Sequence, residues 1–279
     1  VRLRAALGSS LNVPAVYLLD EIGIEAFGKM LRDAGFSLEE EKLQQAGLGS
    51  ALGNFEVSLL EMTRGFALFP RRGVPLELVW FPAAAGEGDI SLAAEQAVSR
   101  YTADVICDIL SDPAARAPGF AYNSAFRLPF PAMFKTGTSD QFQNIWALAA
   151  TPDYTAGVWM GNNTGQTVVG RTGSSVPARI AAEILGIVQQ GSPEFPEPAG
   201  AVPVQICAVS GGRARELCPS VITEYLPAEA AGGPVPGPCT FHVLRNGRVI
   251  TEYPEKYHAW IRELGRSEEF AFSGGEGVA

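Results

Sequence analysis

The residue pattern changes from helical to strand-like and back once along the chain, and this limits the chain to a mixed fold. Apolar residues recur at helical spacing over residues 24–36, 56–69 and 91–110. Residues 131–161 then contain three short runs rich in apolar and β-favouring residues, separated by polar turns. Helical spacing returns over residues 176–189. This order predicts an α+β domain in which helices pack on an antiparallel sheet.

Local signals mark several element ends. Ser58 and Glu61 have the spacing of a capping box and predict the start of a helix, and Gly35 predicts the end of another. We also expect a short strand at residues 76–81 (LELVWF). Asn246 and Gly247 predict the turn of a β-hairpin within VLRNGRVI.

A stretch rich in Pro and Gly, residues 191–203, predicts a linker. We therefore predict a main domain over residues 1–190 and a small β-rich carboxyl-terminal module over residues 204–279, in which residues 253–265 form a helix.

Composition excludes several classes of protein. The net charge of −9 argues against a nucleic-acid binder, because no basic surplus is present to neutralise phosphates. No apolar run approaches the roughly 18 to 20 residues that span a bilayer. The first residues lack an initiating Met and the features of a signal peptide, so we expect the chain to be a segment of a longer protein.

The four cysteines are unevenly placed. Cys107 lies in an apolar helical stretch, where we expect a buried free thiol. Cys207, Cys218 and Cys239 lie near the carboxyl end together with His242. We favour a disulfide there, with one thiol left over, and keep a zinc site formed by these four residues as the alternative.

The two histidines, His242 and His258, both follow the linker, so the main domain has none for a Ser-His-Asp or Cys-His mechanism. Lysine is then the available base. Lys135 is flanked by Phe134 and Thr136 on an apolar strand, where partial desolvation would lower its pKa.

Two short motifs carry further candidate residues. Lys135 opens a Lys-Thr-Gly-Thr run, in which Thr136 and Thr138 share one face of the strand and Gly137 leaves room for another backbone. Ser10 and Asn12 form a Ser-x-Asn pattern after a helical stretch, which on its own also fits a turn cap.

Together these motifs resemble those of the transpeptidase domain of class A penicillin-binding proteins, whose signature is Ser-x-x-Lys, Ser-x-Asn and Lys-Thr-Gly. The stretches SLNVPAV, EVSLLEMTRGFALF, FKTGTSD and TAGVWMGN are similar to that family in the same order. After the linker, ICAVSG, CPS, CTFH and YPEKYHAWIRELG resemble the carboxyl-terminal module of the type 1C branch.

The resemblance implies a penicillin-binding, β-lactamase-like fold and a D,D-transpeptidase without a cofactor, which binds peptidoglycan stem peptides and β-lactams. Ser10 would move a proton to the leaving amine with the help of Asn12, which would also hold the peptide amide of the substrate. Lys135, Thr136 and Thr138 would bind the terminal carboxylate, and the Thr138 N–H would form half of an oxyanion hole.

The sequence departs from the family in one essential motif. None of the four lysines has a serine three positions before it, so no Ser-x-x-Lys is present. We expect the chain to be truncated at its amino end and inactive alone, without the nucleophile, the glycosyltransferase domain and the membrane anchor. The intact protein would lie at the periplasmic face of the inner membrane. A smaller departure is Asn144, where many relatives have an aspartate.

Other functions stay open. The chain could be a non-catalytic module that binds stem peptides or a cell-wall partner, for example through residues 204–265. A β-lactamase or D,D-carboxypeptidase would use the same pocket with water as the acceptor, although the flanking sequence favours the transpeptidase. Apolar surface left exposed by the truncation could also lead to self-association.

Overall fold

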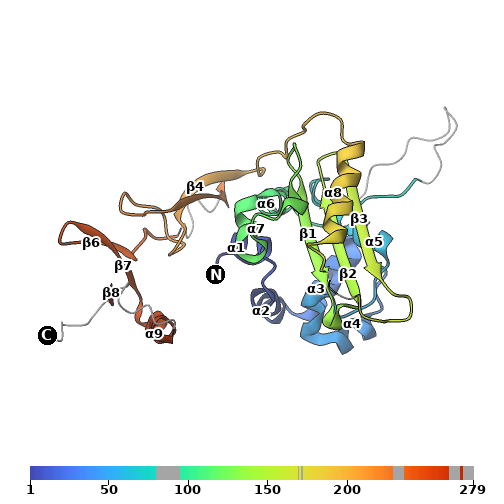
Figure 1. Cartoon of the computed structure of the whole chain (residues 1–279), viewed down its shortest axis with the longest axis horizontal. Helices are drawn as coiled ribbons and strands as arrows, with labels where there is room; N and C mark the ends of the chain where they lie inside the picture. Colours follow the sequence, from blue (N-terminus) through green and yellow to red (C-terminus); the bar gives the residue numbers. More distant parts are fainter. Residues whose placement is uncertain (80–94, 169, 171, 229–235, 264–270, 273–279) are drawn as a thin grey trace. The chain divides into compact units, whose positions relative to one another are not determined.

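The computed structural model describes residues 1–79, 95–168, 170, 172–228, 236–263 and 271–272. The chain divides into two compact units, Val1–Ala199 and Gly200–Ala279 (Figure 1). The described helices of the first unit are α1 (Leu3–Gly8), α2 (Asn12–Ile22), α3 (Ile24–Asp33), α4 (Glu40–Ala46), α5 (Leu59–Ala67), α6 (Arg100–Ser111), α7 (Pro113–Phe120) and α8 (Val176–Val188). None of the described helices is long and apolar enough to cross a bilayer.

The sheet of the first unit is an antiparallel meander in the order β1-β2-β3. Its strands are β1 (Met133–Thr138), β2 (Asn144–Ala150) and β3 (Thr155–Gly161). Lys135 pairs with Leu148 of β2. The α+β architecture with helices on an antiparallel sheet is therefore confirmed.

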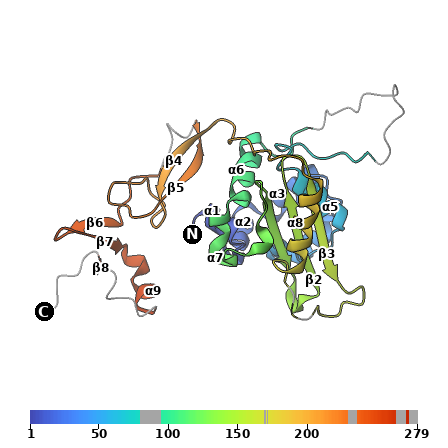
Figure 2. The same ribbon diagram turned by 45° about the horizontal axis from the view of Figure 1, so that its top comes forward.

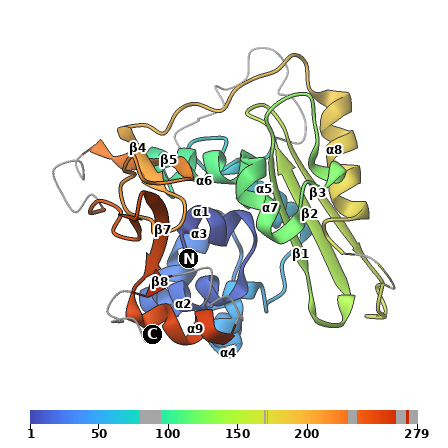
Figure 3. The ribbon, with the colours of Figure 1, turned by 60° about the vertical axis from the view of Figure 1, so that its left-hand side comes forward.

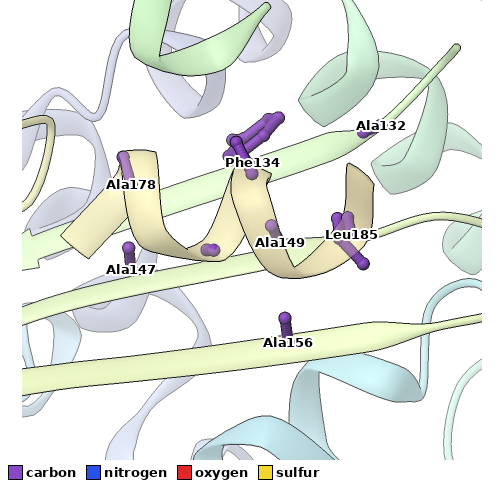
Figure 4. Packing of buried hydrophobic residues seen from close by; sticks show 9 residues of the cluster. Ala132, Phe134, Ala147, Ala149, Ala156, Ala178 and Leu185 are labelled. Atoms are coloured by element: carbon purple, nitrogen blue, oxygen red, sulfur yellow. The ribbon is translucent and has the colours of Figure 1, made fainter. Parts of the chain in front are cut away.

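Successive side chains of β1 point to opposite faces of the sheet, and each face is covered by helices. Phe134 packs with α8 on one face, whereas Met133 packs with α5 and α6 on the other. Figure 3 shows the sheet between α8 on one side and α5 and α6 on the other. Small side chains allow α8 to lie close to the strands (Figure 4). The buried cluster under α8 consists of Ala132, Phe134, Ala147, Ala149, Ala156, Ala178, Ala181, Ala182 and Leu185.

Two predicted helix ends and the predicted free thiol are confirmed. The Ser58 hydroxyl accepts a hydrogen bond from the Glu61 N–H at 3.1 Å, and the Glu61 carboxylate accepts one from the Ser58 N–H at 3.1 Å, which completes the capping box of α5. The chain leaves α3 through Gly35, whose φ is +92°. Cys107 is a buried free thiol, as expected.

The helix predicted over residues 91–110 starts later than expected. Residues 95–99 are not helical, and residues 91–94 lie outside the described part of the chain. The Ser99 hydroxyl caps α6 by accepting a hydrogen bond from the Thr102 N–H, and the Ala97 N–H pairs with the Gly73 carbonyl instead of continuing a helix. Tertiary pairing therefore overrides the helical period there.

The strand predicted at residues 76–81 is wrong for residues 76–79, which form no strand, while residues 80–81 are not described. Helix α7 was not predicted, although Asp112 caps it and Pro113 begins it, which are two ordinary helix-start signals.

The second unit is built from short strands. They are β4 (Ala201–Cys207), β5 (Val221–Pro227), β6 (His242–Arg245), β7 (Arg248–Tyr253) and β8 (Ala271–Phe272). Asn246 and Gly247 have φ values of 49° and 73° and form the predicted hairpin turn between β6 and β7. The helix α9 (His258–Glu263) lies within the predicted helical stretch. Strand β4 begins at Ala201, inside the stretch predicted as a linker.

Candidate active site

The side chains of Lys135 and Ser10 meet in the first unit. Lys135 Nζ donates a hydrogen bond to Ser10 Oγ at 2.7 Å and another to the Thr136 carbonyl oxygen at 2.8 Å. Lys135 lies on β1, and Ser10 lies in the turn between α1 and α2. The fold thus brings the Lys-Thr-Gly strand and the Ser-x-Asn turn into direct contact.

Helix α1 is held against α6 by an arginine. Arg4 is almost fully buried and forms ion pairs with Asp108 and, at 3.1 Å, with Asp112. A buried guanidinium needs such partners, because an unpaired charge would be strongly penalised away from water. Figure 2 shows α1, α6 and α7 grouped on the β1 side of the sheet. These ion pairs hold the helix that leads into Ser10.

Helix α7 fixes the residue before Ser10. Ser9 Oγ donates a hydrogen bond to the Ala115 carbonyl oxygen at 2.9 Å. A Cβ atom at Gly119 would lie 2.5 Å from the Ser9 carbonyl oxygen, so only glycine allows this close approach. The support that these residues provide could not be predicted from sequence patterns, because their contacts are tertiary.

The backbone of Ser10 is strained. Its φ is +55°, in the left-handed region that non-glycine residues rarely adopt. The Ser10 N–H donates to the Leu7 carbonyl at 3.1 Å, and the Leu11 N–H donates to the Ala6 carbonyl at 2.9 Å. Such conformations persist where the surroundings enforce them, often at functional sites. Asn12 follows as the first residue of α2 and is exposed.

Burial lowers the pKa of Lys135 from its ordinary value of 10.5 to about 8. At pH 7 the ammonium form therefore dominates, with about one tenth of the molecules neutral. The side chain can thus attract an anion while also exchanging a proton with the Ser10 hydroxyl. The half-buried position of the side chain agrees with the lowering of its pKa that the sequence led us to expect.

Thr136 and Thr138 share one face of β1, as predicted, and it is the α8 face, opposite to that of Lys135. Thr138 Oγ1 accepts a hydrogen bond from the Gly173 N–H at 3.1 Å. A Cβ at Gly173 would lie 2.8 Å from the Gly137 carbonyl oxygen, so this loop packs closely on β1. Gly137 and Thr138 are exposed, and β1 is an edge strand of the described sheet. Its end is therefore accessible to an extended ligand.

Asn144 lies at the start of β2, where its side-chain oxygen accepts a hydrogen bond from Trp159 Nε1 at 3.0 Å. The side-chain amide of Asn144 therefore makes a structural contact between β2 and β3 at this position.

Two surface cavities lie away from the Lys135–Ser10 pair. One, of about 490 Å³, is lined by residues of α2, α3 and α4, and the other, of about 460 Å³, lies between α7 and the segment before β1. Neither is lined by Ser10, Asn12 or Lys135.

The candidate metal residues lie in the second unit. Cys207, Cys218 and Cys239 are free thiols, so the expected disulfide is wrong for this structure. Their sulfur atoms and a ring nitrogen of His242 all lie within 4.8 Å of one another.

No protein-family model matches the chain. It is 29% identical to penicillin-binding protein 1C of Escherichia coli over 214 residues, which cover 76% of this chain and 26% of that protein. It is 26% identical to penicillin-binding protein 1A of Clostridium novyi over 75% of this chain and 25% of that protein. The chain thus spans about a quarter of the length of these curated relatives.

The fold is similar to that of solved penicillin-binding proteins. Penicillin-binding protein 1A from Haemophilus influenzae superposes with a TM-score of 0.65 and 19% identity, over 82% of this chain and 40% of that chain. Penicillin-binding protein A from M. tuberculosis, solved as an imipenem acyl-enzyme complex, gives a TM-score of 0.51 and 19% identity over 68% of this chain and 48% of that chain. The chain therefore has the fold of the penicillin-binding transpeptidases, and its sequence is similar to class A penicillin-binding proteins, including penicillin-binding protein 1C.

Proposed function

We propose that the protein cross-links peptidoglycan as a serine D,D-transpeptidase and is acylated by β-lactams. The observation that carries the proposal is the hydrogen bond of 2.7 Å between Lys135 Nζ and Ser10 Oγ, which joins the two motifs in one site. The similarity to penicillin-binding proteins supports a role in cell-wall synthesis. In this proposal the chain provides the part of the site that holds the stem peptide.

The proposed reaction is acyl transfer in two steps. A serine hydroxyl attacks the D-Ala-D-Ala amide carbon, the C–N bond breaks, and the leaving amine takes up a proton. Ser10 would relay that proton, with Lys135 holding its hydroxyl. An amine of a second stem peptide would then break the serine ester, form the cross-link and return the proton.

Substrate recognition would use the charge and the exposed end of β1. The Lys135 ammonium attracts the terminal carboxylate of the stem peptide or of a β-lactam, and the Thr138 hydroxyl lies at the exposed end of β1. The Asn12 amide would hold the peptide, and the Thr138 N–H would stabilise the oxyanion. Because the 279 residues contain no Ser-x-x-Lys, the acylated serine is proposed to lie outside them.

The test is covalent labelling by a fluorescent penicillin. The native gene product that contains this chain should be labelled, and Ser10→Ala or Lys135→Met should slow its acylation by about 100-fold. Lys42→Met is the matched control, because Lys42 is an exposed lysine that forms a surface ion pair with Glu39. Failure of the native product to react would overturn the proposed transpeptidase.

The 279-residue chain alone, followed by intact mass, should gain no adduct. A stable adduct at Ser10 or Ser139 would overturn the placement of the acylated serine outside the chain. Release of the acyl group to added D-amino acid rather than to water would separate a transpeptidase from a β-lactamase or carboxypeptidase. A non-catalytic binding module would bind the penicillin without forming a covalent bond to it.

We further propose that the protein works at the outer face of the cytoplasmic membrane, the location that its resemblance to class A penicillin-binding proteins implies. The second unit is proposed to contact cell-wall synthesis proteins.

A further inference from the structure

Four metal-binding side chains meet in the second unit. Cys207 ends β4, Cys218 precedes β5, and Cys239 and His242 lie at the start of β6. Their Sγ atoms and a histidine ring nitrogen all lie within 4.8 Å of one another. Residues separated by up to 35 positions thus converge on one point.

The distances fit one tetrahedral ion. His242 Nδ1 lies 3.5 Å from Cys207 Sγ and 3.3 Å from Cys239 Sγ. In a tetrahedral Zn²⁺ site with ordinary bond lengths, nitrogen and sulfur ligands are about 3.6 Å apart and two sulfur ligands about 3.8 Å apart. We propose that Cys207, Cys218, Cys239 and Nδ1 of His242 bind one Zn²⁺ ion as a closed structural site.

Backbone donors already point at two of the sulfur atoms. The Ser210 N–H donates to Cys207 Sγ at 3.5 Å, and the Arg215 N–H donates to Cys218 Sγ at 3.3 Å. Backbone N–H groups directed at a sulfur atom are contacts that orient metal-binding cysteines. Both sulfur atoms are therefore held in place at the proposed site.

The ring of His242 is oriented for binding through Nδ1. Its Nε2 atom is buried and has no hydrogen-bond partner among the described residues. The neutral tautomer with a free Nδ1 carries its proton on Nε2, so this buried N–H is left unsatisfied. Among the described residues, the ring therefore makes its polar contacts through Nδ1, which faces the sulfur atoms of Cys207 and Cys239.

The surrounding backbone holds the ligands without the ion. The Cys207 N–H donates to the Gly212 carbonyl at 2.8 Å, the Gly211 N–H donates back to the Cys207 carbonyl at 3.0 Å, and the Cys239 N–H donates to the Arg213 carbonyl at 2.8 Å. The loop after β4 is thereby tied to the segment before β6. A metal at this junction would connect the β4–β5 pair to the β6–β7 hairpin.

The unit has a physical need for such a link. Among its described residues, the buried hydrophobic side chains are Ile206, Cys207, Cys239 and Ile261, together with the buried His242. A small domain with so few buried apolar side chains usually needs a disulfide or a metal for stability. Three of these five buried residues are proposed ligands, so the metal site would form the centre of the unit.

The test is the metal content of the 279-residue chain, purified under reducing conditions without a metal-binding tag. Elemental analysis should find about one zinc per chain. Replacement by Co²⁺ should give the sulfur-to-cobalt charge-transfer and visible bands of a tetrahedral thiolate site. Absence of both the zinc and the cobalt bands would overturn the proposal, and so would a disulfide between these cysteines in the metal-loaded protein.

Variants locate the site. Cys239→Ser and His242→Gln should each lower the zinc content at least about tenfold, because a missing ligand opens the closed site. Cys107→Ser is the matched control, since Cys107 is a buried thiol in α6 of the other unit, and it should keep the wild-type content. Wild-type zinc content in Cys239→Ser would contradict the assignment even if the other variants failed to fold.

Discussion

Lys135 Nζ lies 2.7 Å from Ser10 Oγ, although 125 positions separate the two residues in the sequence. The lysine is placed by β1, and the serine is placed by α1, which α6 and α7 hold in position. The pair therefore depends on both the sheet and the helical layer, and its properties can be tested from either side.

The stability of the first unit should depend on pH through Lys135. Its pKa is about 8 in the folded chain and 10.5 ordinarily, so between these values the unfolded chain binds more protons. Stability should therefore rise with pH across this window, by about 1 kcal/mol per pH unit at most, relative to Lys135→Met. Urea unfolding of both proteins at pH 7.5, 9 and 10.5 measures the difference, and a constant difference would contradict the lowered pKa.

Gly119→Ala should displace the turn that holds Ser10. The new Cβ would lie 2.5 Å from the Ser9 carbonyl oxygen, a backbone atom that cannot rotate away. We expect a loss of about 2 kcal/mol in the free energy of unfolding and slower penicillin acylation of the native product. Gly186→Ala is the control, because its Cβ would meet only Leu128, at 3.9 Å, and should leave both quantities unchanged or slightly improve stability.

Arg72→Ala should destabilise the first unit. Arg72 donates to the buried carboxylate of Asp104 at 3.2 and 2.8 Å, and the Ala199 N–H donates to the same carboxylate at 3.0 Å. Removal of the arginine leaves a buried negative charge, at a penalty of about 3 kcal/mol.

A double-mutant cycle tests this pair. Asp104→Asn removes the charge, so the Arg72→Ala substitution should cost clearly less in that background. Thermal or urea unfolding of the four proteins measures the coupling. Equal losses in both backgrounds would show that the ion pair does not account for the effect.

Thr138→Val should weaken recognition of the substrate carboxylate. The change keeps the shape of the side chain but removes the hydroxyl at the exposed end of β1. This hydroxyl also accepts a hydrogen bond from the Gly173 N–H. We expect acylation of the native product by penicillin to slow about tenfold. Thr138→Ser keeps the hydroxyl and should retain most of the rate; equal rates for both variants would rule out a role for this group.

Much of the secondary structure was predictable because its causes are local. The capping box of Ser58 and Glu61, the hairpin turn of Asn246 and Gly247, and the three strands of the sheet depend on residues close together in the chain. The late start of α6 was missed because Ala97 pairs with Gly73, a contact that helical spacing cannot reveal.

The sequence by itself determined the α+β class, the residue types of the site and the similarity to penicillin-binding proteins, because periodicity and short motifs are readable in one dimension. Only the tertiary structure decided that Ser10 meets Lys135, that Arg4 and Gly119 support this contact, and that Cys239 lies beside His242 without a disulfide. Such contacts depend on how distant elements pack, and the burial that lowers the pKa of Lys135 exists only once α1 and β1 are assembled.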